Sequence, residues 1–113
     1  EGDSKVNNII KNNLLNRANG DAEYNIFFKS DKKKIIISSD AKGDPSIYKI
    51  EISLVYETKK DGNLIFKKKL KKQVTYNNID DKFELSKYEE NIITTIANNL
   101  SEEIILSIIS IDK

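Results

Sequence analysis

The sequence predicts an α+β domain in which two helices pack on one face of a mainly antiparallel sheet. Three observations lead to this fold class. A segment of alternating apolar and polar residues lies in the middle of the chain, an Asp-Gly turn follows it, and a long isoleucine-rich helical pattern comes last. Two amphipathic helices can cover the apolar face of such a meander, which gives a two-layer sandwich. We expect residues 1–113 to form a single domain, since the chain contains no repeat and no linker.

The first helix is expected near the N-terminal end of the sequence, with Asp3 or Ser4 as its cap. Asn19-Gly20 is expected to end it, because glycine takes the left-handed conformation of a helix cap at low cost. Asparagine is a mediocre helix former, so this helix must depend on packing. Its apolar face carries Val6, Ile9, Ile10 and Leu14.

Residues 24–37 place a polar run between two apolar runs, and this pattern allows two interpretations. One is a single long strand with a bulge or bend near residues 30–33. The other is a tight hairpin closed at residues 30–32. We prefer the bent strand. Residues 38–46 are expected to form a loop, since they include the turn formers Asp40, Gly43, Asp44 and Pro45.

Residues 48–57 show the clearest strand pattern in the chain. Apolar residues alternate with polar ones, which predicts a strand with one buried face and one wet face. Its apolar positions are Tyr48, Ile50, Ile52, Leu54 and Tyr56. The Asp-Gly pair within residues 60–63 is typical of a hairpin turn and leads into a second long strand over residues 64–76. That strand has Leu64, Phe66, Leu70, Val74 and Tyr76 as apolar positions, and Lys67, Lys69, Lys71 and Gln73 on its solvent face.

The last helix is expected to begin near Ser86, because Ser86 and Glu89 have the spacing of a capping box. From there an apolar residue recurs at every fourth position, which predicts a helix long enough to lie across a small sheet. These residues are Tyr88, Ile92, Ile96, Leu100, Ile104 and Ile108. The simplest interpretation of this pattern is a helix that covers the sheet.

The composition argues against several classes of function. The 113 residues include no His and no Cys, which removes thiolate chemistry, zinc-finger sites and the commonest proton shuttle. The paired carboxylates are sequence neighbours whose side chains diverge, so we expect no enzyme, no catalytic residue, no metal site and no cofactor. A formal net charge of +1 excludes a strongly basic, nucleic-acid-like footprint for the whole molecule. No apolar run reaches the ~20 residues that cross a bilayer.

The lysine-rich run over residues 67–72 is the most conspicuous chemical feature. One interpretation is a solvated face that keeps an edge strand from aggregating. The other is a patch, formed by Lys67, Lys69 and Lys71, that binds a polyanion. Lysine supplies a point charge and not the two-pronged fork of arginine, so such a patch would select weakly among polyanions.

Four segments together resemble the LptE family of lipopolysaccharide (LPS) assembly lipoproteins, and their order and spacing carry the resemblance over nearly the whole chain. The segments are Glu1-Gly2-Asp3, Ser46-Ile47-Tyr48-Lys49-Ile50, Val74-Thr75-Tyr76-Asn77, and Phe83-Glu84-Leu85-Ser86-Lys87-Tyr88-Glu89-Glu90. The resemblance implies the order strand-helix-strand-strand-strand-helix. The first strand and a lipidated cysteine are then expected before Glu1.

The resemblance also implies a non-enzymatic function. A protein of this family is expected to be lipid-anchored at the periplasmic face of the outer membrane, to plug an LptD-type β-barrel and to bind LPS during its insertion. Lys42, beside Gly43, and Lys87, just after the Ser86 cap, are the residues expected to face the LPS phosphates. Lys87 and the free N–H groups of the helix end would grip one phosphate together.

Two further expectations follow. Without the first strand, the sheet edge next to Ile26 and Phe28 should be occupied by a partner or blunted by the bend at residues 30–33. The alternative function is that of a small basic-faced adaptor that binds nucleic acid or another polyanion. A signal peptide ending in a lipidated cysteine, upstream in the gene, would decide for the LptE-like function.

Overall fold

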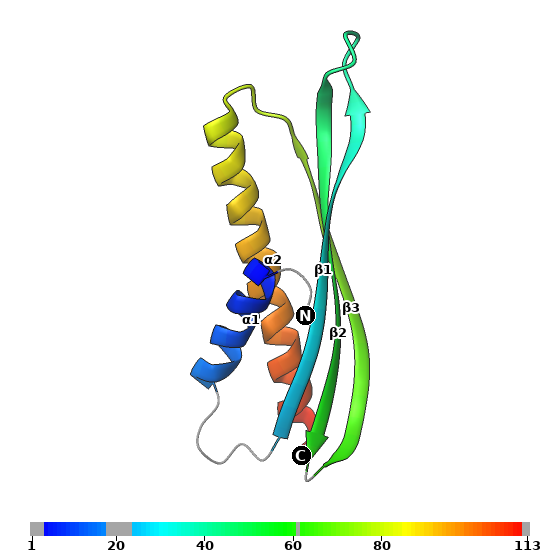
Figure 1. Ribbon diagram of the computed structural model, residues 1–113, viewed down its shortest axis with the longest axis vertical. Coiled ribbons are helices and arrows are strands. Elements are labelled where there is room, and N and C mark those ends of the chain that lie inside the picture. Colours follow the sequence, from blue (N-terminus) through cyan, green and yellow to red (C-terminus); the bar gives the residue numbers. More distant parts are fainter. Residues whose placement is uncertain (1–3, 18–23, 61, 112–113) are drawn as a thin grey trace.

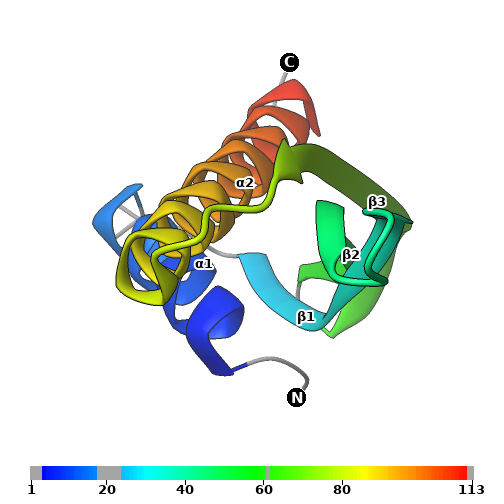
Figure 2. The same ribbon diagram turned by 90° about the horizontal axis from the view of Figure 1, so that it is seen from above.

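The computed structural model describes residues 4–17, 24–60 and 62–111, which form two helices and three strands. The elements, in chain order, are α1 (Ser4–Arg17), β1 (Tyr24–Ser39), β2 (Pro45–Lys60), β3 (Asn63–Asn77) and α2 (Lys82–Ile111). The strands form one antiparallel sheet in the order β1-β2-β3. Both helices lie on the same side of this curved sheet (Figures 1 and 2). The predicted α+β two-layer fold is confirmed.

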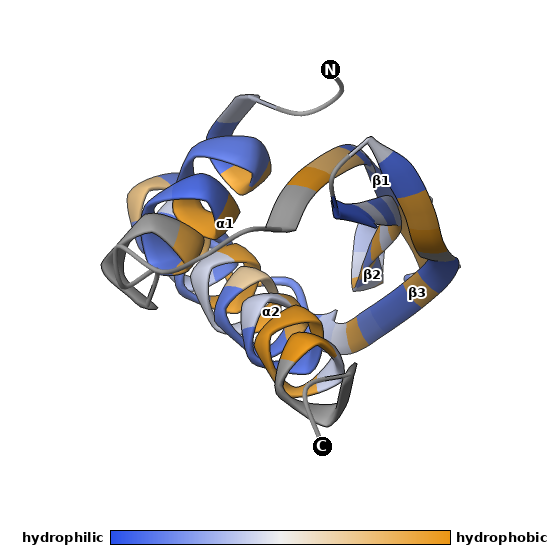
Figure 3. Ribbon diagram, turned by 90° about the horizontal axis from the view of Figure 1, so that it is seen from below, coloured by the Kyte–Doolittle hydropathy of each residue, from blue (hydrophilic) through white to orange (hydrophobic). Residues whose placement is uncertain are grey.

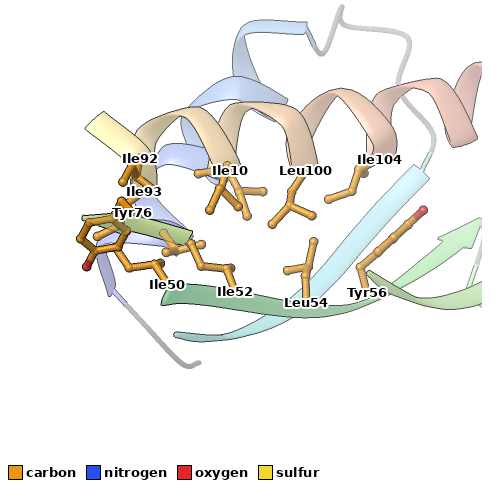
Figure 4. Close-up of a cluster of buried hydrophobic side chains, with 13 residues drawn as sticks. Ile10, Ile50, Ile52, Leu54, Tyr56, Tyr76, Ile92, Ile93, Leu100 and Ile104 are labelled. Atoms are coloured by element: carbon orange, nitrogen blue, oxygen red, sulfur yellow. The ribbon is translucent and has the colours of Figure 1, made fainter. Parts of the chain in front are cut away.

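The central strand β2 supplies the sheet's half of the core. Its residues are alternately buried and partly exposed, as the sequence predicted. The inward side chains point toward the helices (Figure 4), and they are Ile50, Ile52, Leu54 and Tyr56. Burying such side chains contributes about 1.5–3 kcal/mol each. The strand is therefore held by the row of side chains that faces α2.

The helices supply the other half of the core. The buried residues of α2 follow the predicted spacing and include Ile92, Ile93, Ile96, Ala97, Leu100 and Ile104. Val6 and Ile10 of α1 fill the space beside them. Polar contacts join the helices at their edges: Asn13 Nδ2 donates to Asn98 Oδ1 over 2.8 Å, and Lys5 lies 3.7 Å from Glu90. α1 and α2, which are far apart in the sequence, thus lie side by side in one helical layer.

The structure decides between the two interpretations of residues 24–37. β1 is one continuous strand, so the hairpin alternative is wrong. The expected bend at residues 30–33 is also wrong, because pairing with β2 is regular there and the register shifts lie between Ile36 and Ser39. The polar run fits a regular strand for a simple reason. Ser30 is buried but donates to Asn7 Oδ1 over 2.6 Å, while the lysine heads reach solvent from the sheet edge.

The position of β1 also bears on the expected blunting of its edge. β1 forms an edge of the sheet in the described part of the chain, and the irregularity lies near its C-terminal end rather than at residues 30–33. The prediction that a bend at residues 30–33 blunts this edge is therefore wrong. Occupation of this edge by a partner stays a prediction.

The two turns are set by local hydrogen bonding and backbone freedom. The loop predicted for residues 38–46 is shorter, because β1 extends to Ser39 and β2 begins at Pro45. Asp40 closes this turn: its Oδ1 accepts from the N–H of Lys42 and of Asp44. The hairpin turn predicted within residues 60–63 is confirmed by the pairing of the two flanking residues. Gly62 has a φ of +80° there, a conformation that glycine adopts without strain, while residue 61 lies outside the described part.

The start of α2 corrects the predicted cap. The helix begins at Lys82, and Asp81 caps it by accepting from the N–H groups of Phe83 and Glu84 over 2.9 and 3.2 Å. Ser86 therefore lies inside the helix, and the predicted capping box is wrong. The carboxylate of Glu89 is engaged elsewhere, by Lys34 and Tyr76. For the first helix, Ser4 is the first helical residue, whereas Asp3, Asn19 and Gly20 lie outside the described part.

Replacing Ile52 by alanine tests the packing of β2 against the helices. Ile52 is fully buried, so Ile52→Ala should lower the free energy of unfolding by about 2–5 kcal/mol. The matched control is Ile36→Ala, because Ile36 is 55% exposed on β1. Urea unfolding followed by circular dichroism measures both variants. Equal losses in the two would contradict the assignment of Ile52 to the core.

A second pair of variants tests the helix cap. Asp81→Ala should cost about 0.5–2 kcal/mol of stability, because it leaves two backbone N–H groups without their acceptor. Ser86→Ala, inside the helix, should cost little or even stabilise, since alanine is the better helix former. Thermal and urea unfolding measure the difference. A larger loss at Ser86 would restore the helix start predicted from the sequence.

Candidate functional site: the open end of the sandwich

The candidate site lies at the end of the molecule where the β1–β2 turn and the start of α2 are found (Figure 1). The segment between β3 and α2 is tied to this end by Asn78. Its N–H donates to the Ser46 carbonyl and its Nδ2 to the Pro45 carbonyl, each over 2.9 Å. These bonds fix where the chain leaves the sheet for the helix. We call this region the open end.

Three tyrosines from two strands and the helix meet at the open end. Tyr48 of β2 pairs with Tyr76 of β3, and their rings stack with centroids 5.7 Å apart. Tyr88 of α2 meets Tyr76 edge-on, with centroids 5.8 Å apart. Such pairs contribute about 0.5–1.5 kcal/mol beyond their buried area. The tyrosines therefore close the core where the isoleucines of β2 end.

A polar network surrounds the buried hydroxyl of Tyr76. This hydroxyl donates to Glu89 Oε2, and the Lys34 Nζ lies 2.8 Å from the same oxygen. Lys34 Nζ also lies 4.4 Å from the centroid of the Tyr48 ring, a cation–π contact. One carboxylate of α2 thus binds groups from both edge strands, β1 and β3. Burial, and next the hydrogen bond to Glu89, raise the pKa of Tyr76 above its usual range.

Apolar side chains at the open end remain accessible to solvent. Ile36 and Ile37 of β1 are 55% and 48% exposed, and on α2 Phe83 and Tyr88 are 67% and 45% exposed. Ile36 pairs with Tyr48, which places it on the face of the sheet that the helices cover elsewhere. The apolar layer therefore continues past the part of the sheet that the helices seal.

Lys42 and Lys87, the two predicted ligand residues, lie on elements at this end. Lys42 is exposed in the β1–β2 turn. Lys87 lies in the second turn of α2, with its Nζ 4.7 Å from the centroid of the Phe83 ring. Because the helix begins at Lys82 and Asp81 occupies its first N–H groups, Lys87 is not at a free helix end. The predicted shared grip with those N–H groups is wrong, while phosphate binding by the two lysines stays a prediction.

The strand lysines lie on another surface. Lys67, Lys69 and Lys71 face away from the helices, on the outer face of the sheet, as the sequence predicted. Lys67 lies 3.7 Å from Glu57, and Lys71 lies 3.1 Å from Glu51. The hydrogen bond from Lys71 lowers the pKa of the Glu51 carboxyl. The chain therefore has two separate basic regions, one beside an apolar surface and one on the sheet.

The chemistry of the open end is that of binding. In the described residues no cluster of histidine, cysteine, aspartate or glutamate could hold a metal ion, and no helix is long and apolar enough to span a membrane. Exposed apolar side chains beside lysines suit a ligand with an anionic head and an apolar body. Sequence reasoning missed the contacts among Lys34, Tyr76 and Glu89, which are distant in sequence and meet only through strand register and helix position.

Comparison with known proteins relates this two-layer architecture to lipoproteins. No protein-family model and no curated protein matches the sequence. The crystal structure of rare lipoprotein B from Shewanella oneidensis is similar with a TM-score of 0.71 at 13% identity, covering 96% of this chain and 88% of that one. A protein described as a lipoprotein from Caulobacter crescentus CB15 has a TM-score of 0.57 at 14% identity, covering 90% and 76%.

The fold of this chain is therefore LptE-like, as the sequence resemblance implied. The structures of the two similar proteins both cover most of its length. At 13% and 14% identity, the likeness concerns the fold alone. The residues of the open end are thus assigned from their own geometry.

The raised pKa of Tyr76 gives a measurable pH dependence. The unfolded chain ionises this tyrosine near pH 10, and the folded chain ionises it only at higher pH. Its contribution to stability is then present below about pH 10 and is lost as pH rises toward the folded value. Spectrophotometric titration should show a late tyrosine component that Tyr76→Phe removes. Glu89→Gln should move that component to lower pH, whereas an unchanged titration in both variants would contradict the network.

Proposed function

We propose that this protein is an LptE-like assembly protein of the outer membrane that binds LPS at the open end. In this proposal it is lipid-anchored at the periplasmic face and plugs and supports an LptD-type β-barrel while LPS is inserted. The likeness of its fold to rare lipoprotein B supports the lipoprotein part of this proposal. The function proposed is binding, without catalysis and without a cofactor.

The observation that supports LPS binding is that apolar and basic residues lie together at the open end. LPS combines phosphates with acyl chains, so a site for it needs cations next to an accessible apolar surface. Ile36 and Tyr88 offer apolar surface there, and Lys42 and Lys87 lie on the two elements that frame it. A lysine at such a site acts as a point charge toward a phosphate.

The two elements that frame the site are held in place by the core and by Glu89. The bonds of Glu89 to Lys34 and Tyr76 fix α2 against β1 and β3. The apolar residues around them can then meet a ligand without a large rearrangement, and preorganisation of this kind lowers the cost of binding.

Charge reversal at the two lysines tests the proposed site. Lys42→Glu combined with Lys87→Glu should weaken binding of lipid A in non-ionic detergent by about tenfold or more, because a charge-assisted contact contributes about 1.5–3 kcal/mol. The thermal midpoint should stay nearly unchanged, since both lysines lie on the surface. Fluorescence titration measures the binding of lipid A, and circular dichroism the midpoint.

The matched control reverses the same number of charges on the sheet. Lys67→Glu combined with Lys69→Glu alters the net charge equally and should leave lipid A binding nearly unchanged. Loss of binding in this control, with binding retained by the variant at Lys42 and Lys87, would show that the site is misplaced. Equal loss in both would indicate a diffuse electrostatic effect.

A further inference from the structure

The outer face of the sheet is a basic surface that neither helix covers. Strand register assigns its residues, because paired residues of neighbouring strands point to the same side. Two helices lie on the other side (Figure 2). In the described residues this face carries seven lysines and three carboxylates: Lys29, Lys33, Lys49, Lys59, Lys67, Lys69 and Lys71, with Asp31, Glu51 and Glu57.

The carboxylates of this face leave a surplus of positive charge. Glu51 lies within 4 Å of both Lys49 and Lys71, and Glu57 pairs with Lys67. Lys69 stands opposite Val55 and makes no ion pair with a described residue. Seven lysines against three carboxylates give a formal surplus of four positive charges.

The helical layer carries no such surplus. α2 is negative, with five glutamates and two lysines, namely Glu84, Glu89, Glu90, Glu102 and Glu103 with Lys82 and Lys87. α1 adds Lys5, Lys11 and Arg17, so the two helices together are formally neutral and the positive surplus lies on the outer face of the sheet. An extended negative surface would attract the sheet and turn α2 away.

Apolar side chains accompany the lysines toward the β2–β3 turn. Phe27 is exposed on the outer face with the Lys59 Nζ 5.4 Å from its ring centroid. Leu64 pairs with Lys59 and so lies on the same face, because the irregularity between Thr58 and Lys59 shifts the register. The sequence had placed Leu64 on the apolar face of β3, and the shift explains the difference. Along β3, hydrophilic stretches alternate with hydrophobic residues (Figure 3).

A shallow hollow lies among the lysines of β3. Its volume is about 440 Å³, and it is lined by Val55, Lys67, Lys68 and Lys69. Two of these lysines belong to the outer face, and Val55 forms an apolar floor between neighbouring lysines. A hollow with basic walls is suited to a phosphate headgroup.

We propose that, when the protein is not enclosed in a barrel, the outer face of the sheet docks on the surface of an anionic phospholipid bilayer. The lysines contact headgroup phosphates, Phe27 and Leu64 enter the membrane–water interface, and α2 faces the aqueous side. Because the outer face carries a surplus of positive charge, charge complementarity favours an anionic partner. The exposed phenylalanine and leucine favour a bilayer, because an interface accommodates aliphatic and aromatic groups beside lysines.

Vesicle co-sedimentation tests the proposal with the whole chain. The vesicles contain phosphatidylcholine with about one third phosphatidylglycerol, or phosphatidylcholine alone, and no LPS. The chain should bind the first and not the second, and binding should weaken as salt rises, since salt screens exposed charges. Lys67→Glu combined with Lys69→Glu should lower the affinity about tenfold or more. Phe27→Ala should lower it at every salt concentration, since an apolar contact is not screened.

Matched variants separate this surface from the open end. Lys42→Glu combined with Lys87→Glu changes the net charge equally and should keep vesicle binding, although the same variant is expected to lose lipid A binding. Charge reversal at Lys67, beside Glu57, could unfold the chain. In that case the neutral variant Lys67→Gln combined with Lys69→Gln replaces it and should also weaken vesicle binding. The vesicles contain no LPS, so the vesicle assay and the lipid A assay are independent. Failure of one proposal in its assay therefore leaves the other proposal standing.

Four outcomes would overturn the proposal. They are equal binding to both kinds of vesicle, equal loss in the two charge-reversed pairs, unchanged binding after Phe27→Ala, and competition by inorganic phosphate at millimolar concentration. Tighter binding of a single-stranded nucleic acid at the same salt would assign the surface to that polymer instead.

Discussion

The packing of the inward row of β2 against α2 is the interaction on which the rest of the structure depends. β2 pairs with both other strands, so the position of every strand follows from its register. α2 covers it with a row of isoleucines, and α1 adds Val6 and Ile10 at the side. In the described part of the chain the second face of the sheet is mainly basic and offers no other apolar layer. Loss of this contact would leave three strands without a cover.

The two surfaces considered above exist because this core is limited in extent. At the open end the isoleucines of β2 give way to tyrosines, and Glu89 holds the edge strands with polar bonds in place of further packing. On the outer face β3 presents lysine at three successive outward positions, Lys67, Lys69 and Lys71. The alternation that builds the core thus also creates the basic surface, since each inward residue is followed by an outward one.

The sequence was informative where a short-range pattern determines structure. The alternation in residues 48–57 predicted β2 and its buried face, and the Asp-Gly pair predicted the following turn. The sequence was misleading where two candidate helix caps have the same pattern. Asp81 and Glu84 have the same spacing as Ser86 and Glu89, and only contacts from β1 and β3 decide that Glu89 does not serve a cap. The polar run of residues 29–34 suggested a bend, but long lysine side chains at a sheet edge reach solvent without one.

The candidate site was predictable only in part for a related reason. Lys42 and Lys87 could be named from their order along the chain, and both lie at the open end. The cluster of Tyr48, Tyr76 and Glu89 requires the register between β2 and β3 and the position of α2, neither of which a local pattern contains. The outer position of Leu64 likewise depends on one register shift that no residue type announces.

The meeting of α1 and α2 has a consequence for the order in which the chain folds. All strand pairs join neighbours in sequence, and antiparallel hairpins of this kind form from local contacts. The contact between Asn13 and Asn98 instead joins residues 85 positions apart in the sequence. α1 is made before α2, and an asparagine-rich helix of 14 residues is marginal alone. α1 therefore becomes stable only after α2 has been made and has packed beside it, so that an early element of the described chain depends on a late one.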